Sequence, residues 1–276
     1  MKYQVAKCAG SCYGVTRALD LSLKALEDAP HPVQTLGPLI HNPRVVESLA
    51  KKGISSLDEL DANSNGTLVI RSHGTTPQQI AQAKELGLHV IDATCPHVLA
   101  AQKAACDLAR SGYSLIIIGE KNHPEVEGIC AQAPDALIAV ITSIEEIPQS
   151  LPERIGVVVQ TTQSEKRVEE IINELQQRVE DLNYKNTICK ATSARQQAAC
   201  ELAKNVDAMI IIGGHNSGNT RRLAELCEQI CPTFHIESIQ ELKAYDLSKY
   251  SSVGISAGAS TLDSHISEVK SYIDKL

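Results

Sequence analysis

Three cysteines occupy matching places in the chain, each just before a stretch that should form a helix. They are Cys12, Cys95 and Cys189. A thiol at the start of a helix loses its proton more easily, because backbone N–H groups and the helix dipole stabilise the thiolate. Thiolates are soft ligands that favour zinc and iron–sulfur clusters. The wide spacing of these three excludes a zinc ribbon or a compact ferredoxin motif.

If these three thiolates converge and no fourth cysteine joins them, two kinds of metal site are possible. One is a 4Fe–4S cluster whose fourth iron has no protein ligand and is open to substrate. The other is a zinc ion held by three thiolates and one further ligand. Simple burial is the alternative, since free cysteine commonly packs as a small apolar residue. We expect burial for the remaining six, which are Cys8, Cys106, Cys130, Cys200, Cys227 and Cys231.

A set of polar residues follows apolar runs in the same parts of the chain. It consists of His41, His73, His123, Thr161, Ser217, Asn219 and Ser260. Histidines, hydroxyls and an amide, without clustered Lys or Arg, suit a compact anion such as a phosphate. A helix that begins just after Ser217 would add backbone donors. Helix capping is the structural alternative for Ser217 and Asn219.

The loop after His123 also supplies carboxylates, in the run His123-Pro124-Glu125-Val126-Glu127. A glutamate at this place could deliver a proton to a bound substrate. Glu125 is nearer to His123 and is our candidate for that role. Spacing alone does not separate it from Glu127, and plain solvation on the surface is the alternative for both.

An internal repeat indicates which elements position these residues. A shift of 94 residues aligns the segment that begins at Cys95 with the one that begins at Cys189, without a gap. A weaker third copy begins at Cys12. Each copy has a cysteine, a helix, an apolar strand, a glycine turn and then a polar residue, which is His41, His123 or Ser217. A second strand follows in each copy, and its polar tip is His73, Thr161 or Ser260.

The repeat predicts an α/β fold. Continuous β-branched runs suit parallel strands buried on both faces, and here they cover Leu115–Ile118, Val157–Val159 and Met209–Ile212. Helical stretches alternate with them at Pro43–Lys52, Gln78–Leu86, Ser164–Val179 and Thr220–Gln229. We expect three small α/β domains with mostly parallel sheets, related by a pseudo-threefold axis as a trefoil around a central cluster site.

The expected domains cover residues 13–95, residues 96–187, and residues 188–276 together with 1–12. A first strand near Tyr3–Ala6 should complete the sheet of the third domain. If the domains pack around one axis, the cysteines and the polar residues surround the same point, because ligands bind at the carboxyl ends of parallel strands.

Composition narrows the class of protein. The 276 residues are 43% hydrophobic and 21% charged, which is typical of a globular chain and excludes disorder. There is no Trp and only one Phe, so the core must consist of aliphatic residues, and stacking platforms for single-stranded nucleic acid are not expected. A net charge of −7 without a basic run argues against a nucleic-acid partner.

The sequence also bears on location. The first residues form no signal peptide, and no apolar run approaches the roughly 18 residues that a membrane-spanning helix needs. We therefore expect a cytoplasmic protein with reduced thiols and no membrane partner.

The motifs together resemble the 4-hydroxy-3-methylbut-2-enyl diphosphate reductase family of the methylerythritol phosphate route to isoprenoids. The resemblance extends over essentially the whole chain. Its motifs are GSCYGVTRA around Cys12, IHNPRVV at His41, RSHG at His73, DATCP at Cys95, GEKNHPEVEG at His123, QTTQS at Thr161, TICKATSARQ at Cys189, NSGNTRRL at Ser217 and SAGAS at Ser260.

The resemblance implies an oxidoreductase with one 4Fe–4S cluster per chain, held by Cys12, Cys95 and Cys189. It implies that His41, His73, Ser217, Asn219 and Ser260 bind the diphosphate, that His123 and Thr161 lie near the allylic hydroxyl, and that Glu125 donates the proton. The implied reaction removes the hydroxyl as water with two electrons and two protons. The products are isopentenyl and dimethylallyl diphosphates, and a ferredoxin or flavodoxin supplies the electrons.

Two other functions use some of the same residues. A non-redox lyase or hydratase could use an open iron only as a Lewis acid, with the same three thiolates. A metal-binding or redox-sensing module would need the repeat and the cysteines but would not need Glu125.

Overall fold

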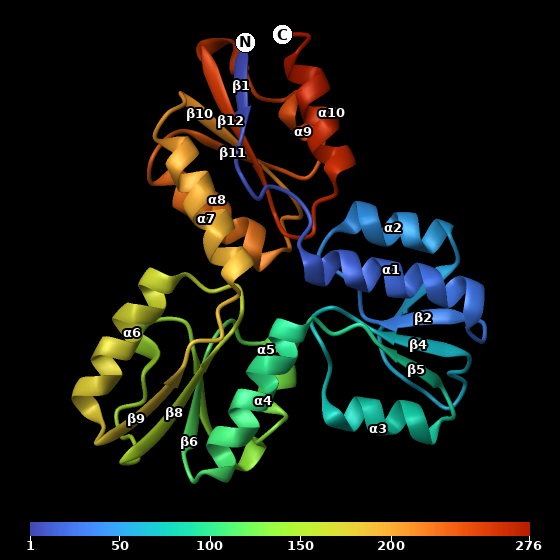
Figure 1. The fold of residues 1–276 in the computed structure, drawn as a ribbon, viewed down its shortest axis with the longest axis vertical. Helices are drawn as coiled ribbons and strands as arrows, with labels where there is room; N and C mark the ends of the chain where they lie inside the picture. Colours follow the sequence, from blue (N-terminus) through green and yellow to red (C-terminus); the bar gives the residue numbers. More distant parts are fainter. The chain divides into compact units, whose positions relative to one another are not determined.

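The structure is a computed structural model that describes all 276 residues. It contains three sheets of four strands, and every strand pairing within them is parallel. Helices alternate with the strands along the chain, so the fold is α/β as predicted. The fold is drawn in Figure 1.

The first sheet has the strand order β3-β2-β4-β5. Its strands are β2 (Val33–Leu36), β3 (Ile54–Leu57), β4 (Thr67–Ile70) and β5 (His89–Asp92). Three helices accompany it, α1 (Tyr13–Asp28), α2 (Pro43–Lys51) and α3 (Pro77–Glu85). Helix α3 begins with a capping box, in which the side chain of Thr76 accepts from the Gln79 N–H and the Gln79 side chain accepts from the Thr76 N–H.

The second sheet has the order β7-β6-β8-β9. Its strands are β6 (Ser114–Ile118), β7 (Leu137–Ile141), β8 (Arg154–Val159) and β9 (Asp181–Lys185). The α-helices beside them in the chain are α4 (Pro96–Arg110), α5 (Pro124–Cys130) and α6 (Glu165–Arg178), with short 3-10 helices η1 (Pro134–Ala136) and η2 (Ile144–Glu146).

The third sheet has the order β1-β12-β10-β11. Its strands are β1 (Lys2–Val5), β10 (Ala208–Ile212), β11 (Thr233–Ile236) and β12 (Ser252–Ala257). Four α-helices and one 3-10 helix belong to this part of the chain: α7 (Lys190–Ala203), α8 (Gly218–Glu228), α9 (Ile239–Leu242), α10 (Asp263–Ile273) and η3 (Leu247–Lys249).

All three sheets have the same topology. In each, the first strand lies between the second and the third, and the fourth forms an edge beside the third. In the third sheet that edge strand is β1, from the amino end of the chain, and Figure 1 shows it in blue next to the red β12. The internal repeat and the return of the first strand to the last sheet are therefore confirmed.

The chain divides into two compact units. Unit 1 consists of Met1–Thr16, His41–Val45 and Lys190–Leu276, and it holds the third sheet. Unit 2 consists of Arg17–Ile40 and Val46–Cys189, and it holds the first and second sheets. The three domain boundaries and the pseudo-threefold arrangement given by the sequence stay predictions.

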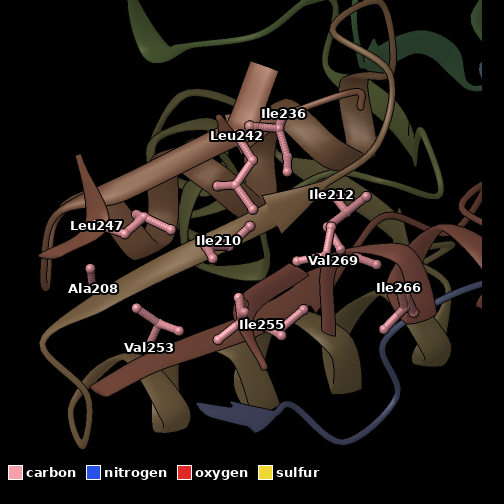
Figure 2. Close-up of a cluster of buried hydrophobic side chains, with 12 residues drawn as sticks. Ala208, Ile210, Ile212, Ile236, Leu242, Leu247, Val253, Ile255, Ile266 and Val269 are labelled. Atoms are coloured by element: carbon pink, nitrogen blue, oxygen red, sulfur yellow. The ribbon is translucent and has the colours of Figure 1, made fainter. Parts of the chain in front are cut away.

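Aliphatic side chains form the core, as the composition requires. In unit 1, Ile210, Ile255 and Val269 are buried together where α10 covers the sheet (Figure 2). In unit 2, the run Ile116–Ile118 is fully buried, and its alternate side chains belong to different clusters. A strand covered on both faces has no polar positions, which explains its unbroken β-branched sequence.

Candidate functional site

The three candidate ligand cysteines are held by the same backbone hydrogen bond in each repeat. The N–H of Cys12 donates to the Ala259 carbonyl at 3.0 Å. The Cys95 N–H donates to the Ser72 carbonyl at 3.0 Å, and the Cys189 N–H donates to the Thr161 carbonyl at 2.9 Å. Each cysteine therefore lies at the start of a helix and beside the loop that follows the third strand of its sheet.

These cysteines fit a thiolate ligand set. All three are free thiols, and all are partly exposed. Each directly precedes a helix, α1, α4 or α7, so its thiolate gains from the helix dipole. Cys12 belongs to unit 1, whereas Cys95 and Cys189 belong to unit 2. No three metal-ligating side chains form a group in the structure, so convergence of the cysteines stays a prediction.

A carboxylate lies at the centre of the candidate residues of unit 2. Glu125 is 1% exposed, in the first turn of α5. The Thr161 N–H donates to Glu125 Oε1 at 2.6 Å, and the Thr161 hydroxyl donates to Oε2 at 3.0 Å. Both carboxylate oxygens are thus fixed by one residue of the loop after β8.

Burial changes the acidity of this carboxyl group. Loss of hydration raises the pKa of Glu125 from 4.5 to about 7, although the two hydrogen bonds from Thr161 act in the opposite direction. Such a group is protonated over much of the neutral range and can donate the proton. Glu127, two residues farther along α5, is exposed. Burial therefore separates the two glutamates that spacing left equivalent.

Two histidines lie beside this carboxyl group in unit 2. The rings of His73 and His123 meet edge to face, with centroids 5.6 Å apart. His123 caps α5, because its Nδ1 accepts from the Glu125 N–H at 3.1 Å. The structure thus brings His73, His123, Thr161 and Glu125 together.

The turn at Gly119, directly after β6, allows His123 and Glu125 to reach their positions. The Gly119 N–H donates to the Ile141 carbonyl at 2.8 Å, directly after β6. A Cβ atom on Gly119 would lie 2.8 Å from the Val126 side chain and 2.9 Å from Gln160 Cβ. Only glycine allows α5 and the loop after β8 to approach this closely.

The amino end of α8 carries two of the candidate anion-binding residues of unit 1. Ser217 is the N-cap, and its Oγ accepts from the Thr220 N–H at 3.3 Å. Its hydroxyl hydrogen is therefore still available to an acceptor. Asn219 is buried, and its Nδ2 has no hydrogen-bond partner. A buried amide donor without a partner is costly, and an anion at the helix end would satisfy it.

The other two candidates of unit 1 contact each other through the backbone. The Ser260 hydroxyl donates to the His41 carbonyl at 3.0 Å. Asn42 reinforces this contact, because its Nδ2 donates to the Ser260 carbonyl at 2.8 Å. The turn after β10 lies against them, since a Cβ on Gly214 would be 3.0 Å from the His41 carbonyl oxygen. Unit 1 therefore gathers His41, Ser260 and the turn that leads to Ser217.

The polar residues that follow the third strands of the three sheets, His73, Thr161 and Ser260, do not occupy equivalent positions. The residue whose carbonyl accepts from the cysteine N–H is Ser72, Thr161 or Ala259. Thr161 therefore corresponds to the residues directly before His73 and Ser260, and the sequence alignment of these tips was wrong by one position. This shift explains why Thr161 faces Glu125 within its own repeat, through its N–H and hydroxyl.

Sequence reasoning missed three residues that hold the loops in place. Asn42 is buried and joins the residue after His41 to Ser260. Gln160 is fully buried, and its Oε1 accepts from the Glu120 N–H at 2.9 Å, which ties the glycine turn to Thr161. Arg195 is buried and donates from its guanidinium to the Cys8 carbonyl. Asn42 and Gln160 each stand directly beside a candidate residue within a quoted motif, whereas Arg195 lies six residues after Cys189.

The six remaining cysteines differ in exposure, although burial was expected for all of them. Cys106 and Cys200 lie within α4 and α7, and Cys227 is in the last turn of α8. Cys8 is exposed and has a φ of 64°, so it is a turn residue and not a buried one. Cys106, Cys130, Cys200 and Cys231 are partly exposed, and only Cys227 is fully buried.

No helix of the structure is both long enough and apolar enough to cross a membrane.

Comparisons with known proteins agree over the whole chain. The family model described as "LytB protein" matches residues 4–274. The 4-hydroxy-3-methylbut-2-enyl diphosphate reductase of Aquifex aeolicus (strain VF5) is 44% identical over 276 residues, which is 99% of this chain and 96% of that protein.

Two solved structures share the fold. One is (E)-4-hydroxy-3-methyl-but-2-enyl diphosphate reductase, described as the terminal enzyme of the non-mevalonate pathway; it is 42% identical, with a TM-score of 0.73 and full coverage of both chains. The other is the E-1-hydroxy-2-methyl-but-2-enyl-4-diphosphate reductase from Plasmodium falciparum, 25% identical, with a TM-score of 0.91 over 100% of this chain and 87% of its own. This chain therefore belongs to the LytB family of 4-hydroxy-3-methylbut-2-enyl diphosphate reductases.

Proposed function

We propose that the chain reduces 4-hydroxy-3-methylbut-2-enyl diphosphate to isopentenyl and dimethylallyl diphosphates. The reaction replaces the allylic C–O bond by C–H, consumes two electrons and two protons, and releases water. Membership of the reductase family supports this function over a lyase or a sensor. Within the chain, the observation that carries it is the buried Glu125 carboxyl group held by Thr161.

Glu125 holds the proton for this reaction at its carboxyl oxygens. A pKa of about 7 leaves the group largely protonated up to neutral pH, whereas an exposed glutamate would already be ionised. The Thr161 hydroxyl can donate its hydrogen bond either to the Glu125 carboxyl oxygen or to a substrate oxygen. Burial also keeps bulk water away from the carboxyl group, so the proton is delivered to a bound group and not exchanged freely.

The family's reductases are iron–sulfur enzymes, and the cysteines of this chain suit such a group. Cys12, Cys95 and Cys189 are the proposed ligands of one 4Fe–4S cluster. When bound, a cluster with three thiolate ligands supplies an iron without a protein ligand, as Lewis acid, and a path for electrons. The thiolates themselves are stabilised by the three helix starts at which they lie.

The diphosphate end of the substrate is assigned to His41, His73, Ser217, Asn219 and Ser260. The Ser217 hydroxyl hydrogen and the Asn219 amide are donors at the start of α8, where the helix dipole favours a negative charge. Neutral donors of this kind hold an anion without a surplus of positive charge. Binding there is remote from the hydroxyl that leaves, so it orients the substrate and does not by itself assist bond cleavage.

His123 and Thr161 are assigned to the hydroxyl end of the substrate. His123 Nδ1 accepts from the Glu125 N–H, which orients the imidazole ring at the start of α5. The electrons are assigned to a ferredoxin or flavodoxin, which transfers them one at a time. We also infer the cytoplasmic location that the sequence suggested.

The proposal is tested with the anaerobically purified, cluster-loaded protein. Iron and sulfide are counted first, and the allylic diphosphate is then supplied with reduced methyl viologen. The expected result is consumption of substrate, with two molecules of one-electron donor oxidised for each molecule consumed. A fully loaded protein that consumes no substrate, or that consumes it without oxidising the donor, overturns the proposal in favour of a sensor or a non-redox lyase.

A further inference from the structure

Two thiols outside the candidate site contact each other in unit 1. Cys200 lies on α7 and Cys227 lies on α8, two helices that pack against each other. Their side chains are hydrogen-bonded thiol to thiol. Cys227 is fully buried, in a cluster with Met209 and Leu223, whereas Cys200 is partly exposed. One sulfur atom of the pair is therefore accessible and the other is protected.

We propose that Cys200 and Cys227 are a reversible dithiol–disulfide pair that is oxidised by low-molecular-weight disulfides. The Cys200 thiolate attacks a sulfur of the oxidant, which breaks the oxidant's S–S bond, forms a mixed disulfide and releases one small thiol. The Cys227 sulfur then displaces the second small thiol and forms the protein disulfide. The two cysteines lose two electrons and two protons, and the oxidant receives both as two thiols.

The surroundings assign different roles to the two sulfurs. The hydrogen bond from Cys227 lowers the pKa of Cys200 to about 7, and the positive charge of Lys204 acts in the same direction against burial. The same hydrogen bond and burial raise the pKa of Cys227. Cys200 is therefore the thiolate that reacts first, and Cys227 is the protonated donor that resolves the mixed disulfide.

The internal repeat contains a natural control for this pair. Cys106 corresponds to Cys200 in the aligned segments, but the position that corresponds to Cys227 holds Ala133. Cys106 is partly exposed like Cys200, and Ala133 packs among apolar side chains. A partly exposed helix cysteine is thus common to both repeats, while a second thiol at the position of Cys227 is present only in the third.

A further thiol lies close to the pair and must be distinguished from it. The Cys231 N–H donates to the Cys227 carbonyl at 3.0 Å, just after the end of α8. Burial raises the pKa of Cys231 as it raises that of Cys227, so acidity does not separate these two thiols. The thiol that is hydrogen-bonded to Cys200 is Cys227. The proposal therefore assigns the bond to Cys200 and Cys227, and it holds whatever reaction the chain catalyses.

The experiment treats the cluster-loaded protein with glutathione disulfide without oxygen, blocks free thiols with an alkylating agent in acid, and maps tryptic peptides. Cys200 lies in peptide 196–204, whereas Cys227 and Cys231 lie in peptide 223–243. We expect these two peptides to be linked through Cys200 and Cys227, as fragmentation identifies, and the link to be reversed by dithiothreitol.

Variants decide the assignment. The link should be lost in C200S and in C227S, and kept in C231S and in C106S. Recovery of Cys200 only as its glutathione adduct, with Cys227 alkylated, would overturn the proposal. A link that persists in C227S through Cys231 would overturn it as well. Because the readout is a peptide and not turnover, this outcome is independent of the proposed reductase activity.

Discussion

At the scale of single residues, burial decides which glutamate does chemistry. Glu125 and Glu127 lie in one motif and one helix, and spacing did not separate them. The structure buries Glu125 against Thr161 and leaves Glu127 in solvent. The family resemblance had already indicated Glu125, but the physical reason is the protein interior, which a linear sequence does not display.

A pH profile tests the hydrogen bond from the Thr161 side chain. This bond stabilises the ionised carboxylate and lowers the pKa of Glu125, so its removal should raise that pKa further above about 7. In T161V the alkaline limb of kcat/KM against pH should therefore move to higher pH, while kcat itself falls. The measurement is kcat/KM across neutral and alkaline pH. An unmoved limb would show that another group controls it.

The stability of the fold should depend on the same proton. The pKa of Glu125 is higher in the folded chain, about 7, than its ordinary 4.5, so the native state binds more protons between these values. Stability from this group is complete below pH 4.5 and falls as the pH rises through about 7. Its loss amounts to about 3 kcal/mol. E125Q should lack this fall, which denaturant unfolding of both proteins at pH 5 and pH 8 can measure.

At the scale of elements, the sequence predicted most of what the structure contains. The buried runs, the helices beside them and the return of β1 to the third sheet are confirmed, with bounds that differ by one or two residues for most elements. The continuous β-branched runs made this possible, because both faces of those strands are covered. The loops were harder, since a one-residue shift, as at Thr161, leaves the pattern of residue types unchanged.

Helix α8 and the loop after β12 meet too closely for any residue but glycine. A Cβ on Gly258 would lie 2.0 Å from Thr220 Oγ1, and Thr220 is fully buried. We expect G258A to lower the free energy of unfolding by about 1–3 kcal/mol and to raise the KM for the diphosphate substrate, because the start of α8 must shift.

The control for this prediction is the double variant G258A/T220A, which removes the obstructing side chain. It should recover part of the lost stability and substrate affinity. A double variant that is as impaired as the sum of its single variants would mean that the close approach is not the cause.

At the scale of the whole molecule, neither the sequence nor its internal repeat shows how the two compact units are placed relative to each other. The repeat places one cysteine at the same point of three equivalent topologies, and the structure confirms that local equivalence. How the two compact units meet depends on contacts that periodicity does not describe. Convergence of Cys12, Cys95 and Cys189 therefore stays a prediction that chemistry must test.

Substitution of the cysteines tests that convergence. C12S, C95S and C189S should each lose bound iron or hold it less firmly, because a hard hydroxyl is a poor replacement for a soft thiolate. C106S is the matched control, since it changes a partly exposed thiol within a helix and not one at a helix start. Iron, sulfide and the absorption spectrum are measured after anaerobic reconstitution. Equal loss in C106S would show that the cysteines are sorted wrongly.

The central claim is that the buried Glu125 carboxyl group delivers the proton in a reductive dehydroxylation. The most direct measurement compares anaerobic substrate turnover by E125Q and E127Q, each loaded with the same amount of iron and sulfide and supplied with reduced methyl viologen below pH 7. The account predicts that E125Q is slower by a factor on the order of a hundred or more, while E127Q stays close to the parent protein. An E125Q protein that turns over at the parental rate would contradict it.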